Sequence, residues 1–176
     1  MPNPLDPIWN AHGITLDAYG VVRRALALAP GERAAALQVG QFAAPATDAQ
    51  VETLLDAAED ALNEQTVMFL FATFQATLRD HVAAQAPRLA PAAAPGPQFG
   101  PDLQAWFEGQ VGRAYLDSVV GLFRPWAGAT LVTQANAIRD YRHWLAHGKR
   151  TAPKPPVAPN AAYATLTSFL QACNLA

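Results

Sequence analysis

The chain has 176 residues, of which 51% are hydrophobic and 15% are charged, and its 12 basic and 14 acidic side chains give a net charge of −2. This length suits one globular domain with a sizeable core. A charged fraction well below the usual ~25% excludes a charge-driven disordered chain and a coiled-coil rod. We therefore expect a single domain over residues 1–176.

Neither the first residues nor the apolar runs indicate a membrane or an export route. The start, MPNPLDPIW, has no apolar stretch behind a basic residue, so it does not resemble a secretory signal. The longest strongly apolar run, Val67 to Ala72, is far short of the ~20 residues that a membrane span needs. One cysteine, Cys173, excludes an intrachain disulfide and fits a reducing compartment. We expect a cytoplasmic protein.

The charges are unevenly distributed along the chain. Residues 48–64 contain six acids and no lysine or arginine, so this segment should repel phosphate. Residues 139–154 contain one acid and five basic side chains, namely Arg139, Arg142, Lys149, Arg150 and Lys154. The basic segment could attract phosphate. A helix end favoured by the macrodipole, followed by a solvated tail, explains Lys149 and Arg150 equally well.

Prolines and glycines divide the chain into segments that read as helices, and no strand pattern competes with them. We expect helices over residues 15–29, 32–43, from 48 onward, 102–123, 130–147 and 161–175. Residues 86–101 and 151–160 are rich in proline and predict a mobile loop and an extended connector. The fold class is therefore all-α, a bundle of four or five principal helices, with residues 1–46 as an extension of short helices.

The long central helix has a clear predicted start. Residues Thr47 to Gln50 have the form of a capping box, in which cap and third side chain satisfy each other's backbone donors. Helical spacing predicts a core-facing stripe opposite the acids, made of Val51, Leu54, Leu55, Ala58 and Leu62. The following run VMFLFATFQATL is apolar nearly all round, which indicates burial on several sides or a dimer contact. The helix either continues to Gln85 or breaks near Asn63.

Three further helix ends are predicted from single residues. We expect the helix over 102–123 to stop at Arg124-Pro125, since proline removes a backbone donor. Gly148 is well placed as the left-handed stop of the next helix. Asn160 could cap the last helix.

Only the segment from Asn136 to Gly148 combines the residue types that chemistry needs at a usable spacing. At about 100° per residue, one side carries the apolar residues Leu131, Ile138, Tyr141 and Leu145. The other side carries the polar residues Asn136, Arg139, Asp140, His143 and His147. Arg142 lies roughly 140° around the helix from His147, so these two side chains diverge within one chain.

This segment resembles a known family motif. Residues Arg142 to Gly148, RHWLAHG, resemble the R-x4-6-H motif of the HEPN family (higher eukaryote and prokaryote nucleotide-binding domains). The surrounding IRDYRHWLAHGKR is similar to the late helix of the RiboL-PSP branch, and FATFQATLRDHV more weakly resembles the family's earlier core helix. The resemblance implies an all-helical, metal-independent endoribonuclease that works as a dimer with its motif helices facing each other. By this resemblance, His147 corresponds to the motif histidine and Arg142 to the motif arginine. His143 corresponds to the polar residue that follows the motif arginine.

The chemistry of RNA cleavage through the 2′-hydroxyl agrees with this resemblance. A base must remove the hydroxyl proton, an acid must protonate the leaving 5′-oxygen, and positive charge must stabilise the phosphorane. Histidine can fill either proton role and arginine offers a charged fork for phosphate oxygens. We expect Arg142, His143 and His147 to be catalytic, and the substrate-binding residues to be Asn136, Arg139, Trp144, Lys149 and Arg150. A two-fold dimer would let two chains share one cleft.

No metal or cofactor is expected. His143 and His147, four residues apart, could ligate zinc, but no H-E-x-x-H glutamate lies between them and no cysteine is near. The structural alternatives are an ion pair of Arg142 with Asp140 or with an acid of the long helix, and a packed Tyr141. The four tryptophans are expected in the core or an interface, although Trp144 could stack on a base.

Two functions follow from the sequence. The first is an endoribonuclease of HEPN type that acts on RNA as a homodimer, in a toxin or phage-defence system with an antitoxin or regulatory protein as partner. The second is a catalytically inactive HEPN-like helical dimer that binds a nucleotide, RNA or a protein partner, with the motif organising an interface.

Overall fold

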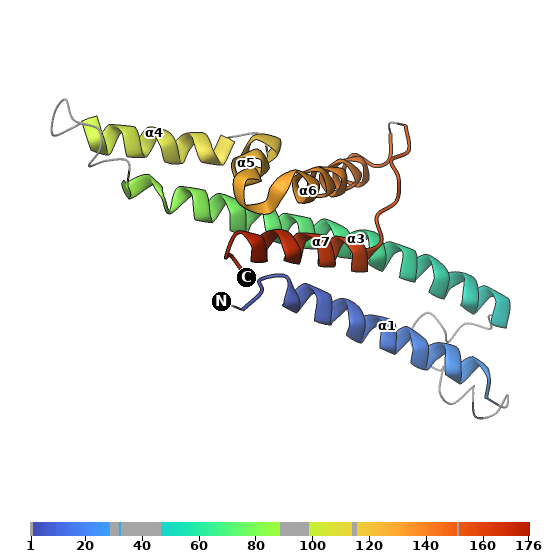
Figure 1. Ribbon diagram of the computed structural model, residues 1–176. Coiled ribbons are helices and arrows are strands. Elements are labelled where there is room, and N and C mark those ends of the chain that lie inside the picture. The colour runs from blue at the N-terminus through green and yellow to red at the C-terminus, as the bar shows by residue number, and fades with distance from the viewer. Residues whose placement is uncertain (1, 29–31, 33–46, 89–98, 114–115, 151) are drawn as a thin grey trace. The chain divides into compact units, whose positions relative to one another are not determined.

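The computed structural model describes residues 2–28, 32, 47–88, 99–113, 116–150 and 152–176 (Figure 1). All regular structure in these ranges is helical, so the predicted all-α fold class is confirmed. The elements are α1 (Asp6–Leu26), α3 (Asp48–Ala83), the short 3₁₀ helix η2 (Ala86–Arg88), α4 (Phe99–Arg113), α5 (Leu116–Leu122), α6 (Arg124–Ala146) and α7 (Pro159–Ala172). The predicted helix over residues 32–43 lies, beyond Glu32, outside the described residues, as does most of the loop predicted over 86–101.

The chain forms two compact units, and each is described by itself. Unit 1 consists of Met1–Asp6 and Val67–Ala176, and unit 2 of Pro7–Thr66. The boundary between them falls inside α3, which is one continuous helix of 36 residues. Of the two alternatives for this segment, the uninterrupted helix is therefore the correct one.

The start of α3 confirms the predicted capping box. The backbone N–H of Thr47 donates to Oε1 of Gln50 at 2.8 Å, and the backbone N–H of Gln50 donates to Oγ1 of Thr47 at 3.3 Å. Two donors that the first helical turn leaves free are thereby satisfied reciprocally.

Unit 2 pairs α1 with the first half of α3. One arginine of α1, Arg23, reaches three acids of α3: it lies 2.8 Å from Asp56, 2.8 Å from Glu59 and 3.5 Å from Glu52. Its hydrogen bonds to Glu59 and then Asp56 raise the pKa of Arg23 further above its ordinary value. The acidic segment is thus partly neutralised within the chain, which the charge pattern alone did not reveal.

A second contact in unit 2 involves a buried histidine. His12 is 6% exposed, stacks on Trp9 with ring centroids 5.3 Å apart, and shares a 2.9 Å hydrogen bond between its Nε2 and Oδ1 of Asn63. Val51 and Leu55 are buried as predicted, but Leu54 is 46% exposed, so its expected place in the core was wrong. The reason is geometric: Leu54 lies about 100° around the helix from Leu55.

The core of unit 1 is built on the second half of α3. Its buried residues follow a helical stripe of Val67, Leu70, Phe71, Phe74, Leu78 and Val82. Phe74 meets Phe169 of α7 edge to face, with centroids 5.1 Å apart, and Phe169 meets Phe123 at 6.2 Å. Phe69 lies on the other side of α3 and is exposed, so the apolar run is not buried all round.

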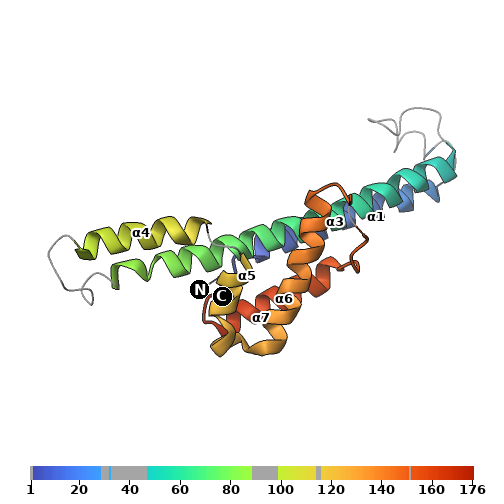
Figure 2. The ribbon, with the colours of Figure 1, turned by 90° about the horizontal axis from the view of Figure 1, so that it is seen from above.

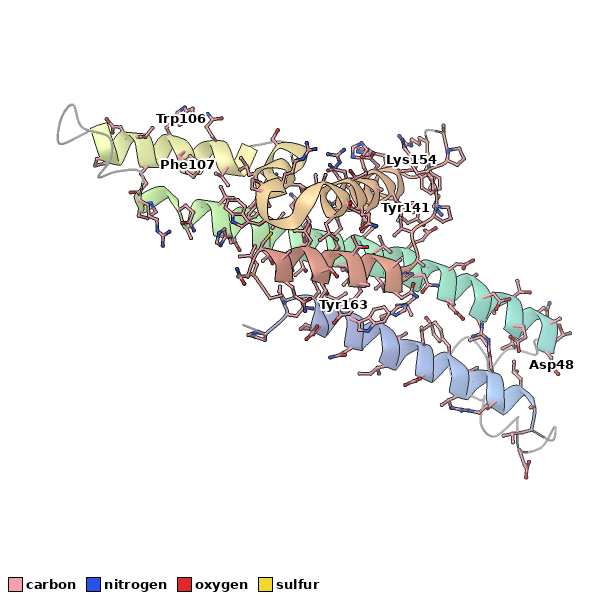
Figure 3. The ribbon with its side chains drawn as sticks, viewed as in Figure 1. Asp48, Trp106, Phe107, Tyr141, Lys154 and Tyr163 are labelled. Atoms are coloured by element: carbon pink, nitrogen blue, oxygen red, sulfur yellow. The ribbon has the colours of Figure 1, made fainter. Side chains whose placement is uncertain are left out.

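Helices α5, α6 and α7 pack in sequence against one another (Figure 2). The proline-rich residues 153–158 contain no regular structure and join α6 to α7, as predicted for an extended connector. Figure 3 shows Lys154 in this connector and Tyr163 on α7. Helix α7 ends at Ala172. A left-handed stop follows it, in which Asn174 has a φ of 55° and the Leu175 N–H donates to the Leu170 carbonyl at 2.8 Å.

Residues at the start of unit 1 attach to α7. The side-chain amide of Asn3 donates to Oγ1 of Thr167 at 3.0 Å, and the Tyr163 hydroxyl donates to Oδ1 of Asp6 at 2.7 Å. This carboxylate, together with burial of the phenol, raises the pKa of Tyr163 above its usual 10.0. Leu5, between these groups, is fully buried.

Several predicted helix limits were wrong, and proline accounts for most of them. Helix α1 begins at Asp6 rather than residue 15, and α4 begins at Phe99, inside the predicted loop. Arg124-Pro125 begins α6 instead of ending the helix before it. In each case a proline stands in the first turn, where its missing N–H has no helical partner to lose.

The helix expected over 102–123 is described as α4 and α5, and residues 114–115 between them lie outside the described residues. One other prediction was wrong. Asn160 does not cap α7: the N-cap is Ala158 and Pro159 occupies the first turn, which is a favoured place for proline. Trp106 and Trp126 are exposed and do not belong to the core. In the described part of the chain, no helix is long and apolar enough to cross a membrane.

Two glycine substitutions test the backbone conformation, one inside a helix and one at a helix end. A Cβ at Gly20, inside α1, would meet nothing within 4 Å, so Gly20→Ala should raise the free energy of unfolding by about 0.5–1 kcal/mol. At Gly148, φ is +66°, so Gly148→Ala should lower it by about 1–2 kcal/mol. Urea denaturation of both variants measures the difference, and equal effects would contradict these backbone assignments.

The bond between Tyr163 and Asp6 predicts a loss of stability at alkaline pH. Because the folded pKa of Tyr163 is raised, the stabilisation is fully present below about pH 10 and is lost as the pH rises through the folded pKa. Tyr163→Phe should therefore cost about 1 kcal/mol at pH 7 and much less at pH 11 or above. Urea midpoints of both proteins across this range test it; a difference that does not shrink would refute it.

Candidate functional site

The orientation of α6 is set by its apolar side. Ala135, Ile138 and Tyr141 are buried, and α6 packs chiefly against α7. The predicted packing of Tyr141 is thereby confirmed (Figure 3). Gly128, with φ 81° and ψ 162°, kinks the helix, so the long straight part follows it. Because the buried residues lie on one side, the polar residues lie on the other.

Two histidines meet at the exposed end of this polar side. The rings of His143 and His147 have centroids 4.2 Å apart and an interplanar angle of 60°. Both side chains are exposed to solvent. A spacing of four residues places them one turn apart on the same face. The structure therefore brings two imidazoles together at an accessible place.

Arg142 lies on a different side of α6. It is half-buried, and its Nε is buried without a hydrogen-bond partner among the described residues. By helical rotation it lies within about 20° of Ala135, on the flank of the packed side. A buried donor left unsatisfied carries a free-energy cost of about 1–3 kcal/mol. Arg142 and the two histidines are thus not brought together within one chain.

Asp140 binds the neighbouring arginine instead of Arg142. Nε and Nη2 of Arg139 donate to Oδ1 of Asp140 at 3.1 and 2.9 Å. The ion pair of Arg142 with Asp140, one of the two structural alternatives for this arginine, is not formed, because Asp140 binds Arg139. Asn136, one helical turn before Arg139, is half-buried and its Oδ1 has no hydrogen-bond partner among the described residues.

The end of α6 confirms the predicted left-handed stop at Gly148. Its N–H donates to the carbonyl of Leu145, and the Lys149 N–H donates to the carbonyl of Trp144, both at 3.0 Å. These two bonds define a Schellman motif. Lys149 also has a positive φ of 59°, and its Nζ lies 5.6 Å from the centre of the Trp144 ring. This contact between the two residues could not be anticipated from the motif letters.

Arg150, the last of the predicted substrate-binding residues, is exposed directly after this turn. Trp144 is half-buried and stacks on Tyr141 with ring centroids 5.9 Å apart. One face of its indole is therefore engaged by the protein, and Lys149 lies over the ring. Lys149 and Arg150 place two positive charges within three residues of His147.

The described residues contain no group of three or more histidine, cysteine, aspartate or glutamate side chains that could hold a metal ion. Cys173, the single cysteine, is half-buried, and burial raises the pKa of its thiol. What the end of α6 offers is proton transfer by imidazole and anion binding by arginine and lysine.

Comparison of the chain with protein-family models, with curated proteins and with solved structures finds no match. The resemblance to the HEPN motif therefore rests on the residues of α6 themselves.

The unsatisfied Nε predicts that Arg142 does not stabilise the fold. Arg142→Met removes the buried donor and keeps most of the packing volume, so the free energy of unfolding should stay the same or rise by up to about 1 kcal/mol. Arg23→Met is the matched control, because Arg23 binds three acids and its loss should lower the free energy of unfolding. Chemical denaturation of both variants makes the comparison. If Arg142→Met lowered the free energy of unfolding more than Arg23→Met does, Arg142 would be a structural residue.

Proposed function

We propose that the protein is an endoribonuclease of the HEPN type, which cleaves RNA as a homodimer with groups at the end of α6. The observation that carries the proposal is the pair of exposed imidazoles of His143 and His147, 4.2 Å apart. A half-buried Arg142 with an unsatisfied donor supports it, since nucleases keep charged groups that the fold itself does not need.

The reaction needs no metal and balances with protein groups alone. An imidazole removes the proton of the ribose 2′-hydroxyl, and that oxygen attacks the adjacent phosphorus. The bond from phosphorus to the 5′-oxygen breaks, and a second imidazole donates a proton to the leaving oxygen. The products are a 2′,3′-cyclic phosphate and a 5′-hydroxyl end. In this proposal His147 supplies proton transfer, and His143 assists it within the same chain.

The positive groups would bind and stabilise the phosphate. Arg142 supplies a guanidinium fork for the phosphorane oxygens. Because it diverges from His147 on the helix, the proposal requires two α6 helices that face each other, with Arg142 of one chain near His147 of the other. Lys149 and Arg150 would attract the RNA backbone, with Asn136, Arg139 and Trp144 as further contacts.

In this proposal the enzyme works in the cytoplasm as a toxin or a phage-defence effector, controlled by an antitoxin or another regulatory protein. Free RNA is abundant there, so uncontrolled cleavage would be harmful. A protein partner that covers the exposed end of α6 would provide the control.

Incubation of purified protein with mixed cellular RNA in EDTA tests the activity. Wild-type protein should produce fragments with cyclic phosphate ends. His147→Ala should slow cleavage by about 10²- to 10⁴-fold, which is the usual contribution of one acid or base. Arg88→Ala changes an exposed basic residue outside the basic segment 139–154; it is the control and should cleave like the wild type.

Three results decide the interpretation. Absence of cleavage by the wild type, over RNA of varied sequence, removes the enzyme hypothesis. Equal cleavage by wild type and His147→Ala indicates a contaminating nuclease and has the same consequence. Retained activity with Arg142→Met would leave the histidine pair and remove the proposed role of the arginine.

A further inference from the structure

Helix α1 is apolar on two opposite faces. One face packs in unit 2, where His12 and Arg23 contact α3. The opposite face presents Ile14 and Val21, which are 71% and 57% exposed. A helix packed on one side is normally polar on the other. The second apolar stripe is therefore left exposed by the described residues of the unit.

The stripe has the spacing of a coiled-coil seam. The α1 seam, as we call it, consists of Ile14, Ala18, Val21 and Ala25. Successive members are three and four residues apart, so alanine occupies every a position of a heptad and a large aliphatic residue every d position. A seam of this kind buries its side chains against a second helix.

The alternation of small and large residues selects an antiparallel partner. In an antiparallel pair of α1 seams, each a residue faces a d residue of the other copy. Ile14 then faces Ala25 of the second copy, and Val21 faces its Ala18. Every layer combines one large and one small side chain, which fills the interface evenly. A parallel pair would place alanine on alanine in every other layer and leave voids.

The charged residues that flank the α1 seam also favour an antiparallel pair of two copies. Asp17 and Arg24 both occupy g positions on one flank of α1 and both are exposed. Seven residues separate them, about 10 Å along the helix, so they do not pair with each other. In the antiparallel pair, Asp17 of each copy lies beside Arg24 of the other. In the parallel pair, Asp17 would face the uncharged Val22.

We propose that the α1 seam binds the same seam of a second copy of this chain, antiparallel, with two reciprocal pairs of Asp17 and Arg24. This surface belongs to unit 2, whereas the proposed nuclease site lies on α6 in unit 1. The contact is therefore separate from the pairing of α6 helices and does not depend on any activity. A seam of about two heptads forms a weak contact, so association should depend on protein concentration.

Charge reversal in the full-length chain tests the contact by sedimentation equilibrium. Asp17→Arg and Arg24→Asp each create two like-charge contacts, and each should raise the dissociation constant of the seam-mediated step by roughly tenfold or more. An equimolar mixture of the two variants should restore association, because one chain then carries arginine at both g positions and the other carries aspartate at both. The double variant should also associate, since exchanging the two charges within each chain keeps both pairs opposite in sign.

The variants Val21→Asp and Leu54→Asp are a matched pair that tests the apolar part of the proposed contact. Both residues are aliphatic and about half exposed in unit 2, but only Val21 belongs to the α1 seam. Val21→Asp should weaken association and Leu54→Asp should not. Circular dichroism checks that each variant keeps its helices.

The contact is refuted by any of three outcomes. In the first, the wild-type protein stays monomeric up to millimolar concentration. In the second, the charge reversals leave the association unchanged. In the third, the two single variants associate no better when they are mixed. The second outcome would assign the dimer to another surface, including α6, and would leave the proposed nuclease untouched.

Discussion

The contact of Phe169 with Phe74 and Phe123 is the interaction on which the arrangement of unit 1 depends. One ring of α7 meets an aromatic ring of α3 at 5.1 Å and another at the start of α6 at 6.2 Å. Aromatic pairs of this geometry add about 0.5–1.5 kcal/mol each to the gain from burial. Because Phe123 directly precedes α6, the cluster anchors the beginning of that helix. The apolar side of α6 then faces α7, and the two histidines remain accessible.

Much of the fold follows from local sequence signals. The capping box of Thr47 and Gln50 and the glycine stop at Gly148 were predicted correctly because each depends only on residues within one or two turns. The predicted helix limits beside proline were wrong because the sequence cannot tell the first turn of a helix from its interior. Leu54 was misplaced because an apolar residue at the edge of a stripe can be buried or exposed, depending on what packs there.

Contacts between residues that are far apart in the chain could not be predicted from the sequence. The acids around Asp56 read as an uncompensated negative face, whereas Arg23, 33 residues earlier in the chain, binds three of them. The apolar residues of α1 likewise gave no indication of which face would pack, since both faces are apolar. At the candidate site, the sequence indicated which residues share a face of α6. The meeting of the two imidazole rings and the unsatisfied Nε of Arg142 depend on rotamers and packing, which only coordinates provide.

Unit 1 is assembled from two separate stretches of the chain, residues 1–6 and 67–176. During synthesis, Asn3 and Asp6 leave the ribosome before their partners Thr167 and Tyr163, which emerge more than 150 residues later. Contacts of such sequence separation slow folding, because a long loop must close before they form. Unit 2, which is continuous, can complete its own contacts earlier. Until α7 has been translated, the buried stripe of α3 lacks Phe169, and the nascent chain exposes apolar surface that a chaperone would recognise.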